Sequence, residues 1–425
     1  METYGQILNV ASPLFLLLVL IEKAYGWWKQ KMPFNTMDTL SSMSSGYTNT
    51  VKDVLGLSIT ILSYTWLVQH LMIYQVKSSI WIYVIAFVAL DFTGYCVHRM
   101  SHEFNFFWNK HAIHHSSEEF NLACALRQSI SGFVSLFTIF LLPAALLGVP
   151  ANVIAVVAPI HLFAQFWYHT TYIGKMGILE YIIVTPSHHR VHHAINPEYL
   201  DKNHGQIFII WDKLFGTFQE ELPHVPPVYG ITRPASTWNP IKINFQHLWL
   251  LIEDAYHTKN WKDKFRIWLM PTGWRPADVI EKYPDKKIED PYNFEKYTTH
   301  ASQNLNAWIW FQFLTTFAFL FYFYGHIAQI GMPMMFVYGA FIFITVWAYT
   351  ELMDKNQNAV VYESVKNALG LGFIIYTGGW FGLENTAYSW CIFLIVGYFI
   401  ISTFVTYWFV KYEMLDSKIG VLRTS

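Results

Sequence analysis

The chain has 425 residues, of which 53% are hydrophobic, 18% aromatic and only 13% charged. Soluble domains carry about 25% charged residues, so this composition excludes an ordinary soluble protein and indicates one embedded in a membrane. A formal net charge of −1 leaves no basic field that would attract nucleic acid. The three cysteines, Cys96, Cys124 and Cys391, are scattered and indicate neither a CxxC metal site nor a disulfide framework.

Apolar runs of membrane-spanning length recur along the chain and predict an all-α polytopic membrane protein. The first run follows a short N-terminus without the basic region and cleavage site of a signal peptide, so we expect it to be retained as a span. Val149-Pro150 separates two later runs and predicts a tight helical hairpin. The nine predicted spans are 3–21, 54–74, 80–97, 130–149, 151–168, 305–325, 328–350, 367–383 and 386–410.

The distribution of basic residues predicts the orientation of these spans. With the N-terminus outside, 27 of the 28 lysines and arginines fall in segments on the inner side, and only Lys77 falls elsewhere. Cytoplasmic loops carry such an excess of Lys and Arg. We therefore expect nine spans with the C-terminus in the cytoplasm, in a bacterial inner membrane or in the endoplasmic reticulum.

The spans divide the chain into three regions. Residues 1–79 contain N-terminal spans, 80–304 a catalytic region and 305–425 C-terminal spans. Between 169 and 304 no run is long enough to cross a bilayer, which predicts a substantial domain on the aqueous side. Residues 38–50 are small and polar and favour an inner loop or a surface helix.

Twelve of the 18 histidines lie between His98 and His204, and three groups among them have metal-ligand spacing. Residues at i, i+3 and i+4 share one face of a helix, so each group can direct two or three imidazoles at one point. The span 80–97 ends at the first group, and the others lie in segments on the same inner side. We therefore expect all three to converge beneath the bilayer. The groups are His98-Arg-Met-Ser-His102, His111-Ala-Ile-His114-His115 and His189-Arg-Val-His192-His193.

Eight imidazoles exceed the usual coordination of one ion and predict two metals. Imidazole suits Zn, Cu, Fe and Ni, so the ligand type alone does not choose the metal. A structural zinc needs only four ligands and normally recruits cysteine. A hydrolytic zinc pair stays an alternative, although bridging carboxylates are missing from the three groups. Iron with O2 is the preferred interpretation.

Further residues near these groups are candidates for the site. Ligating histidines usually hydrogen bond to a carboxylate or a carbonyl through the second ring nitrogen. Asp91, inside the span before His98, is expected to orient the ligating rings, since a charge in a span is functional by default. Glu103 is a candidate base or ligand, with a plain surface acid as the alternative. His169 is a candidate ninth ligand, and His188 a weaker one. Asp201, Asn203 and His204 follow the third group closely enough to return to it.

These histidine groups, in this order and with their flanks, resemble the fatty acid hydroxylase (sterol desaturase) superfamily. Within it the chain is most similar to the alkylglycerol monooxygenase family. The stretches that carry the resemblance are Asp91-Phe-Thr-Gly-Tyr-Cys-Val-His-Arg, His114-His-Ser-Ser-Glu-Glu-Phe-Asn-Leu, Ala125-Leu-Arg-Gln-Ser, Thr185-Pro-Ser-His-His-Arg-Val-His-His and Ile210-Trp-Asp-Lys-Leu-Phe-Gly-Thr-Phe.

The resemblance implies a di-iron centre that oxidises a lipid with O2. It implies attack on the ether-linked carbon of a 1-O-alkylglycerol, which releases a fatty aldehyde and glycerol. It also implies tetrahydrobiopterin as reductant, with another electron donor or donor protein as the alternative. The implied iron ligands are His98, His102, His111, His114, His115, His189, His192 and His193.

Three other interpretations stay open at this point. The first is a hydroxylase or desaturase of the same superfamily that acts on a fatty acyl chain, sphingoid base, sterol or carotenoid. The second is a metal transporter, although transport sites lie near the bilayer midplane and these groups lie at inner helix ends. The third is a lipid sensor without catalytic activity that keeps a structural metal.

Overall fold

The computed structural model describes residues 2–29, 35–60, 63–74, 79–132, 134–135 and 137–414. The chain divides into two compact units. The bundle unit comprises Met1–Leu57, Ser236–Lys242 and Tyr297–Ser425, and the histidine unit comprises Ser58–Ala235 and Ile243–Lys296.

The described residues are almost entirely helical, and five helices are long and apolar enough to cross a membrane. This makes the chain a multi-pass membrane protein, as its composition predicts. The five candidate spans are Tyr4–Trp28, Ile80–Glu103, Gln303–Ile330, Met334–Met353 and Cys391–Met414.

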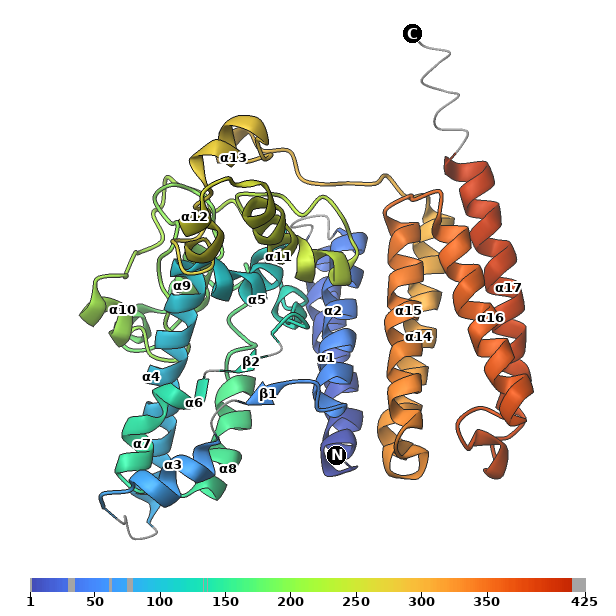
Figure 1. Ribbon diagram of the computed structural model, residues 1–425, viewed down its shortest axis with the longest axis horizontal. Helices are drawn as coiled ribbons and strands as arrows, with labels where there is room; N and C mark the ends of the chain where they lie inside the picture. Colours follow the sequence, from blue (N-terminus) through green and yellow to red (C-terminus); the bar gives the residue numbers. More distant parts are fainter. Residues whose placement is uncertain are drawn as a thin grey trace. The chain divides into compact units, whose positions relative to one another are not determined.

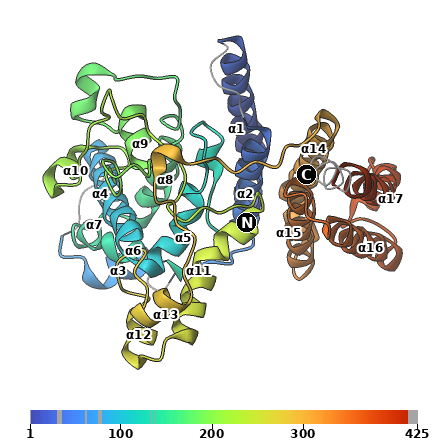
Figure 2. The same ribbon diagram turned by 90° about the horizontal axis from the view of Figure 1, so that it is seen from above.

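The bundle unit packs long helices side by side, and its last four run beside one another in both views (Figures 1 and 2). Helix α1 packs against α14, α2 against α14 and α15, and α16 between α15 and α17. Helix α16 starts at Ala359, so the predicted span 367–383 begins eight residues after the helix itself. The helices are α1 (Glu2–Trp28), α2 (Thr36–Val54), α14 (Gln303–Ile330), α15 (Met334–Met353), α16 (Ala359–Thr377) and α17 (Cys391–Trp408).

The prediction of a loop or surface helix at residues 38–50 is wrong, because this stretch lies in α2 and is largely buried. Ser42, Ser44 and Thr48 have no exposed surface, and the Ser44 hydroxyl lies 2.5 Å from that of Tyr349 on α15. Small residues let helices approach closely, and in an apolar setting their hydroxyls find partners on the neighbouring helix. Polarity in this stretch therefore indicates helix packing and not exposure to water.

In the histidine unit, α4 (Ile80–Glu103) and α8 (Ala151–Phe163) lie together and form an apolar core with α3 (Tyr64–Leu71) and α7 (Leu142–Leu146). Figure 1 shows α3 and α7 near one end of α4, and α5 (Asn105–His115) and α9 (Pro186–His192) near the other. Helix α4 therefore links an apolar end to the end that carries the histidines.

Two of the predicted spans are wrong as continuous helices. In 54–74, α2 ends at Val54 and a helix resumes only at α3, while 130–149 breaks into β2 (Val134–Ser135), α6 (Phe137–Phe140) and α7. Strand β1 (Ile59–Thr60) pairs in parallel with β2, so backbone groups of the two interruptions bond to each other. Backbone that leaves a helix needs such a partner in an apolar environment. The span predicted at 151–168 also ends early, since α8 stops at Phe163.

Short helices and loops complete the histidine unit on the side of α5 and α9. They confirm that 169–304 contains no complete helix that is both long and apolar enough to cross a membrane among the described residues. Besides α9, the helices are α10 (Ile210–Phe215), α11 (Pro240–His257), α12 (Trp261–Arg266) and α13 (Ala277–Lys282), with the first residues of α11 belonging to the bundle unit.

Candidate metal centre

The first two histidine groups meet at a break between α4 and α5. Phe104 is extended (φ −124°, ψ 133°) and separates the two helices. The break is held by the backbone of a later segment: the amides of Asn105 and Phe106 donate to the carbonyls of Met270 and Trp268, at 3.0 and 2.9 Å. The chain can therefore turn sharply while the last turn of α4 and the whole of α5 keep their histidines on facing sides.

The third group lies on α9, a helix of only seven residues that begins at Pro186. Proline suits the first helical position, because its fixed φ is helical and the amide hydrogen that it lacks would have no partner within the helix there. Glu180 holds this end, because it accepts from the hydroxyls of Thr185 and Ser187 at 2.8 Å each. The short helix then aims His189, His192 and His193 into the space in front of α4 and α5.

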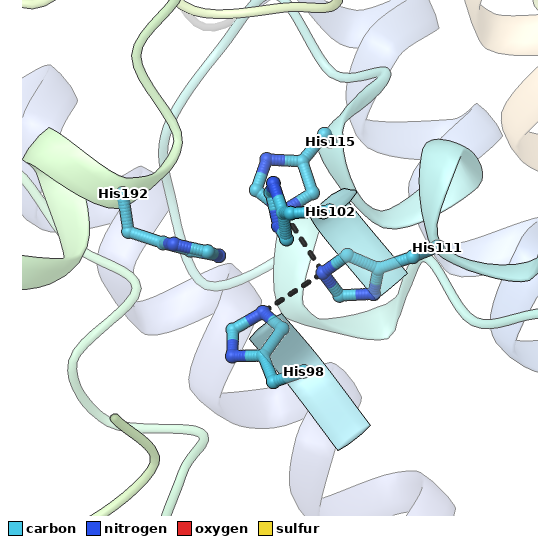
Figure 3. A group of neighbouring side chains, drawn as sticks. All are labelled: His98, His102, His111, His115 and His192. Atoms are coloured by element: carbon cyan, nitrogen blue, oxygen red, sulfur yellow. Dashed lines mark hydrogen bonds between the residues drawn. The ribbon is translucent and has the colours of Figure 1, made fainter. Parts of the chain in front are cut away.

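All nine histidines predicted as ligands come together, in two groups. Within each group every residue offers one ligand atom, and these atoms all lie within 4.8 Å of one another. Figure 3 shows the rings of the five-histidine group turned toward one another, with His192 entering from α9. The five-histidine group is His98, His102, His111, His115 and His192, and the four-histidine group is His114, His169, His189 and His193.

The two groups are neighbours, because successive residues of α5 are divided between them. His115 belongs to the five-histidine group, yet its ring stacks on that of His193 in the other group with centroids 4.3 Å apart. His114 faces the four-histidine group, with its centroid 4.6 Å from that of His193. One centre with two adjacent ligand sets therefore lies at the end of α4.

Most rings are oriented through Nδ1, which leaves Nε2 for the centre. The Nδ1 atoms of His98, His192 and His169 lie 2.8–3.1 Å from the carbonyls of His204, Lys202 and Gln165. That of His114 lies 3.3 Å from the Arg127 carbonyl, and that of His102 lies 3.1 Å from Oδ1 of Asp201. Such hydrogen bonds fix the tautomer and raise the basicity of a metal-ligating ring.

The spacing of the inward nitrogens fits a metal. The Nε2 atoms of His98 and His115 lie 2.9 and 3.0 Å from that of His111, and those of His169 and His193 lie 2.9 and 3.0 Å from that of His189. Imidazole nitrogens bound about 2.1 Å from an ion are ~3 Å apart when they are adjacent in an octahedron. The Nε2 atoms of His102 and His192 are also buried without a protein partner among the described residues. The residues present therefore fit a metal site.

Burial keeps these imidazoles neutral, which is the form that binds a metal. It lowers the pKa of His111, His115, His189, His192 and His193 well below 6.5, and neighbouring histidines lower it further. The pKa of His169 is lowered in the same way. Burial also lowers the pKa of His114 to about 4.

The carboxylates are arranged differently from the prediction. Asp91 is fully buried but accepts from His161, from the amides of Ile207 and Phe208, and from the Trp211 indole, at 2.8–3.1 Å. It therefore contacts none of the nine histidines and instead fastens the loop that follows the His204 carbonyl.

Glu103 does not face the centre either. It pairs with Arg99 at 2.7 Å, one turn away on α4, and its side chain is 44% exposed. The carboxylate that reaches a ligating ring is that of Asp201. Asn203 and His204 also return to the site: Asn203 donates to the His188 carbonyl, and the His204 carbonyl accepts from His98. His188 faces Glu180 at 3.2 Å and belongs to neither group.

Two residues at the centre were not predicted. Trp108 packs against His102 and His115, with ring centroids 5.2 and 5.6 Å apart. Arg127 is buried, and besides its carbonyl contact with His114 it donates to the Ser116 hydroxyl at 2.7 Å. Trp108 lies one turn before His111 and two turns before His115 on α5, a helical spacing that could have identified it.

Comparison with known proteins agrees with this geometry. The fatty acid hydroxylase family model matches residues 83–217, a range that contains all nine histidines. Alkylglycerol monooxygenase of Homo sapiens is 34% identical over 370 residues, 86% of this chain and 82% of its own length. That of Danio rerio is 35% identical over 300 residues, 68% of this chain and 66% of its own. Ornithine lipid hydroxylase of Rhizobium tropici is 28% identical over 197 residues, 46% and 54% of the two chains. No solved structure matches.

The identity to the human enzyme extends over most of both chains and well beyond the hydroxylase region, and the histidine groups lie inside the matched part. The protein is thus a membrane-embedded oxidoreductase that oxidises a lipid, as the resemblance of its histidine motifs implies. The chain belongs to the alkylglycerol monooxygenase family of the fatty acid hydroxylase superfamily.

Proposed function

We propose that this chain is a di-iron monooxygenase that cleaves the ether bond of 1-O-alkylglycerols. The observation that carries the proposal is the pair of adjacent imidazole groups at the end of α4. Nine neutral nitrogen ligands without a bridging carboxylate favour a redox-active pair over a hydrolytic zinc pair. Relatives named for alkylglycerol oxidation, which align over most of the chain, support this lipid over a fatty acyl chain, sphingoid base, sterol or carotenoid.

The proposed reaction balances with one O2 and two electrons. One oxygen atom enters the C–H bond of the alkyl carbon next to the ether oxygen, giving a hemiacetal, and the other leaves as water with two protons. The hemiacetal then breaks its C–O bond to give a fatty aldehyde and a glycerol hydroxyl, which takes the hemiacetal proton. Two iron ions would supply the activation of O2, and a tetrahydropterin or an electron-donor protein would supply the two electrons.

The protein's own contribution is ligand orientation and access. The carbonyls of His204, Lys202 and Gln165, with the Asp201 carboxylate, hold the rings so that Nε2 faces the centre. A fully apolar groove of about 350 Å³ between α4 and α8 suits an alkyl chain. Tyr83, Phe87, Val157, Ile160 and Phe208 are among its lining residues.

The same proposal places the centre on the cytoplasmic face. The asymmetry of lysine and arginine supports that side. Nine crossings are compatible with five long helices on three conditions. Helix α16 must cross, the interrupted stretches 54–74 and 130–149 must cross as broken segments, and α8 must cross together with the residues that follow it. A transporter is disfavoured because the histidines gather at a helix end.

Metal analysis with Mössbauer spectroscopy tests the centre. We expect about two irons per wild-type chain, and about one after either His192→Ala or His189→Ala, each of which removes a ligand from one group. His326→Gln is the matched control, because among the described residues its hydrogen bond and its ring contact are both to Tyr322 on its own helix. Zinc in place of iron, or full iron content in both variants, would contradict the proposal.

Product analysis tests the reaction separately. Purified protein with O2, a tetrahydropterin and a chain-labelled 1-O-alkylglycerol should release labelled fatty aldehyde. A labelled chain hydroxylated elsewhere, with the ether intact, would instead identify a hydroxylase. Consumption of O2 also separates the enzyme from a lipid sensor.

A further inference from the structure

A cavity of about 130 Å³ opens directly against the centre, entirely within the histidine unit. Four of the nine histidines line it: His102, His115, His192 and His193. Its other walls come from the loop after α9, from residues 230–233, from α11 and from residues 272–275. A molecule in this cavity therefore touches residues that hold both ligand sets.

Two polar groups in the cavity wall have donors without an acceptor. The Nη1 of Arg233 and the Oγ1 of Thr272 are both buried and have no hydrogen-bond partner among the described residues. A buried donor that is left unpaired costs about 1–3 kcal/mol, and more if it is charged. Burial accordingly lowers the pKa of the Arg233 guanidinium. Such a pair is stable only if something brings oxygen acceptors into the cavity.

The neighbouring guanidinium of Arg275 has the carboxylate partners that Arg233 lacks. Arg275 also lines the cavity, yet it donates to both oxygens of Asp254, at 2.6 and 2.8 Å, and pairs with Asp285 at 2.9 Å. Arg233 has no comparable carboxylate within bonding distance among the described residues. Among the described lining residues, the arginine without a carboxylate partner is thus Arg233.

Aromatic and apolar side chains share the rest of the lining with polar ones, which include Asn105, Asp201, His247, Asp285 and Lys287. Trp108, which packs on His102 and His115, and Trp274 both face the cavity, together with Leu250 and Leu251. An occupant must therefore combine oxygen acceptors with a carbon skeleton. The polar end of a lipid has this chemistry.

We propose that this cavity binds the oxygen-rich headgroup of the lipid substrate, with Arg233 and Thr272 donating hydrogen bonds to its hydroxyl or phosphate oxygens. This inference rests on the proposed function. In an ether lipid the oxidised carbon is bonded to a headgroup oxygen, so the headgroup must lie beside the metals. A lipid oxidised in mid-chain would keep its headgroup many bonds away, and a polar cavity against the ligands would then have no purpose.

Equilibrium binding without O2 tests the inference, because no turnover occurs. Metal-loaded, full-length protein in detergent is titrated with a 1-O-alkylglycerol and with its 3-phosphate. We expect Arg233→Gln to weaken binding roughly tenfold or more and Thr272→Val by severalfold, since hydrogen bonds to charged groups exceed neutral ones. Arg233→Lys should restore part of the loss. Lys286→Gln is the matched control, as Lys286 is exposed and is not a lining residue.

The two lipids distinguish the sources of the oxygen acceptor. A loss in Arg233→Gln confined to the phosphate lipid identifies a phosphate headgroup, and an equal loss on both identifies the glycerol hydroxyls. Unchanged dissociation constants in both Arg233→Gln and Thr272→Val would overturn the inference. So would variants that bind lipid normally but lose affinity for a tetrahydropterin, which would reassign the cavity to the reductant.

Failure of the proposed function is a separate result. If the wild-type protein forms no aldehyde but the variants still lose lipid affinity, the ether-cleavage proposal fails and the headgroup site stands. If aldehyde forms and the variants bind lipid and turn over like the wild type, the headgroup site is refuted and the ether-cleavage proposal is not. In turnover, the expected signature is a raised KM with little change in kcat, because Arg233 holds the substrate without reaching the metal ligands.

Discussion

At the scale of single residues, two carboxylates near the last turn of α4 differ in their expected effect on metal binding. Asp201 accepts from Nδ1 of His102 at 3.1 Å, although its side chain is 55% exposed. Glu103 pairs with Arg99 and faces away from the rings. Loss of a hydrogen-bond partner of a ligating histidine typically costs 10–100-fold in metal affinity. Asp201, which comes from a distant loop, therefore matters more for metal binding than Glu103, which is adjacent to His102 in the sequence.

We therefore expect Asp201→Asn to weaken iron binding roughly tenfold or more, while Glu103→Gln leaves it unchanged. Competition with a chelator of known affinity measures the difference, with thermal unfolding as the check that both variants fold. A loss of iron in Glu103→Gln alone would contradict this arrangement and would restore Glu103 as a ligand or base.

At the scale of elements, α11 is fastened to α5 by buried polar contacts. His247 Nε2–H donates to the carbonyl of Asn105 at 3.1 Å, and the amide of Leu248 donates to Oδ1 of Asn109 at 3.0 Å. Burial, with a smaller contribution from the charge of Arg233, lowers the pKa of His247 to about 4. This helix also forms one wall of the cavity beside the centre.

The contact predicts a pH dependence. His247 has a pKa near 6.5 in the unfolded chain and about 4 in the folded one, so the unfolded state takes up a proton first as the pH falls. The contribution of this residue to stability is constant above pH 6.5 and declines between pH 6.5 and 4, by up to roughly 3 kcal/mol. His247→Gln keeps a donor for Asn105 but cannot titrate. Its melting temperature in detergent should fall less than that of the wild type across this range, and parallel curves would refute the assignment.

At the scale of the whole molecule, the charge distribution predicts the side on which each loop lies. Only Lys77, which lies outside the described residues, is expected on the outer side. In a background with Cys96, Cys124 and Cys391 replaced by serine, Lys77→Cys should react with an impermeant maleimide in intact cells. Lys286→Cys and Lys355→Cys should react only after permeabilisation. Labelling of position 286 from outside would place the centre on the other face of the membrane.

Much of the centre followed from the sequence, because its governing interactions are local. Spacing of three and four residues puts imidazoles on one helical face whatever surrounds the helix, so the three groups were recognisable and His169 could be added as a ninth candidate. Their convergence was predictable because the predicted spans and the distribution of basic residues put all three groups on one side.

Tertiary structure alone decided how the histidines are shared. His114 and His115 are adjacent in sequence but belong to different ligand sets, because His115 meets the histidines of α4 and His192, while His114 meets His169, His189 and His193. It also decided that Asp91 pairs with His161, 70 residues away, and that Asp201 and not Glu103 reaches His102. The buried polar face of α2 depends in the same way on its neighbours. These outcomes depend on the relative orientation of segments distant in the chain, and no local periodicity encodes that orientation.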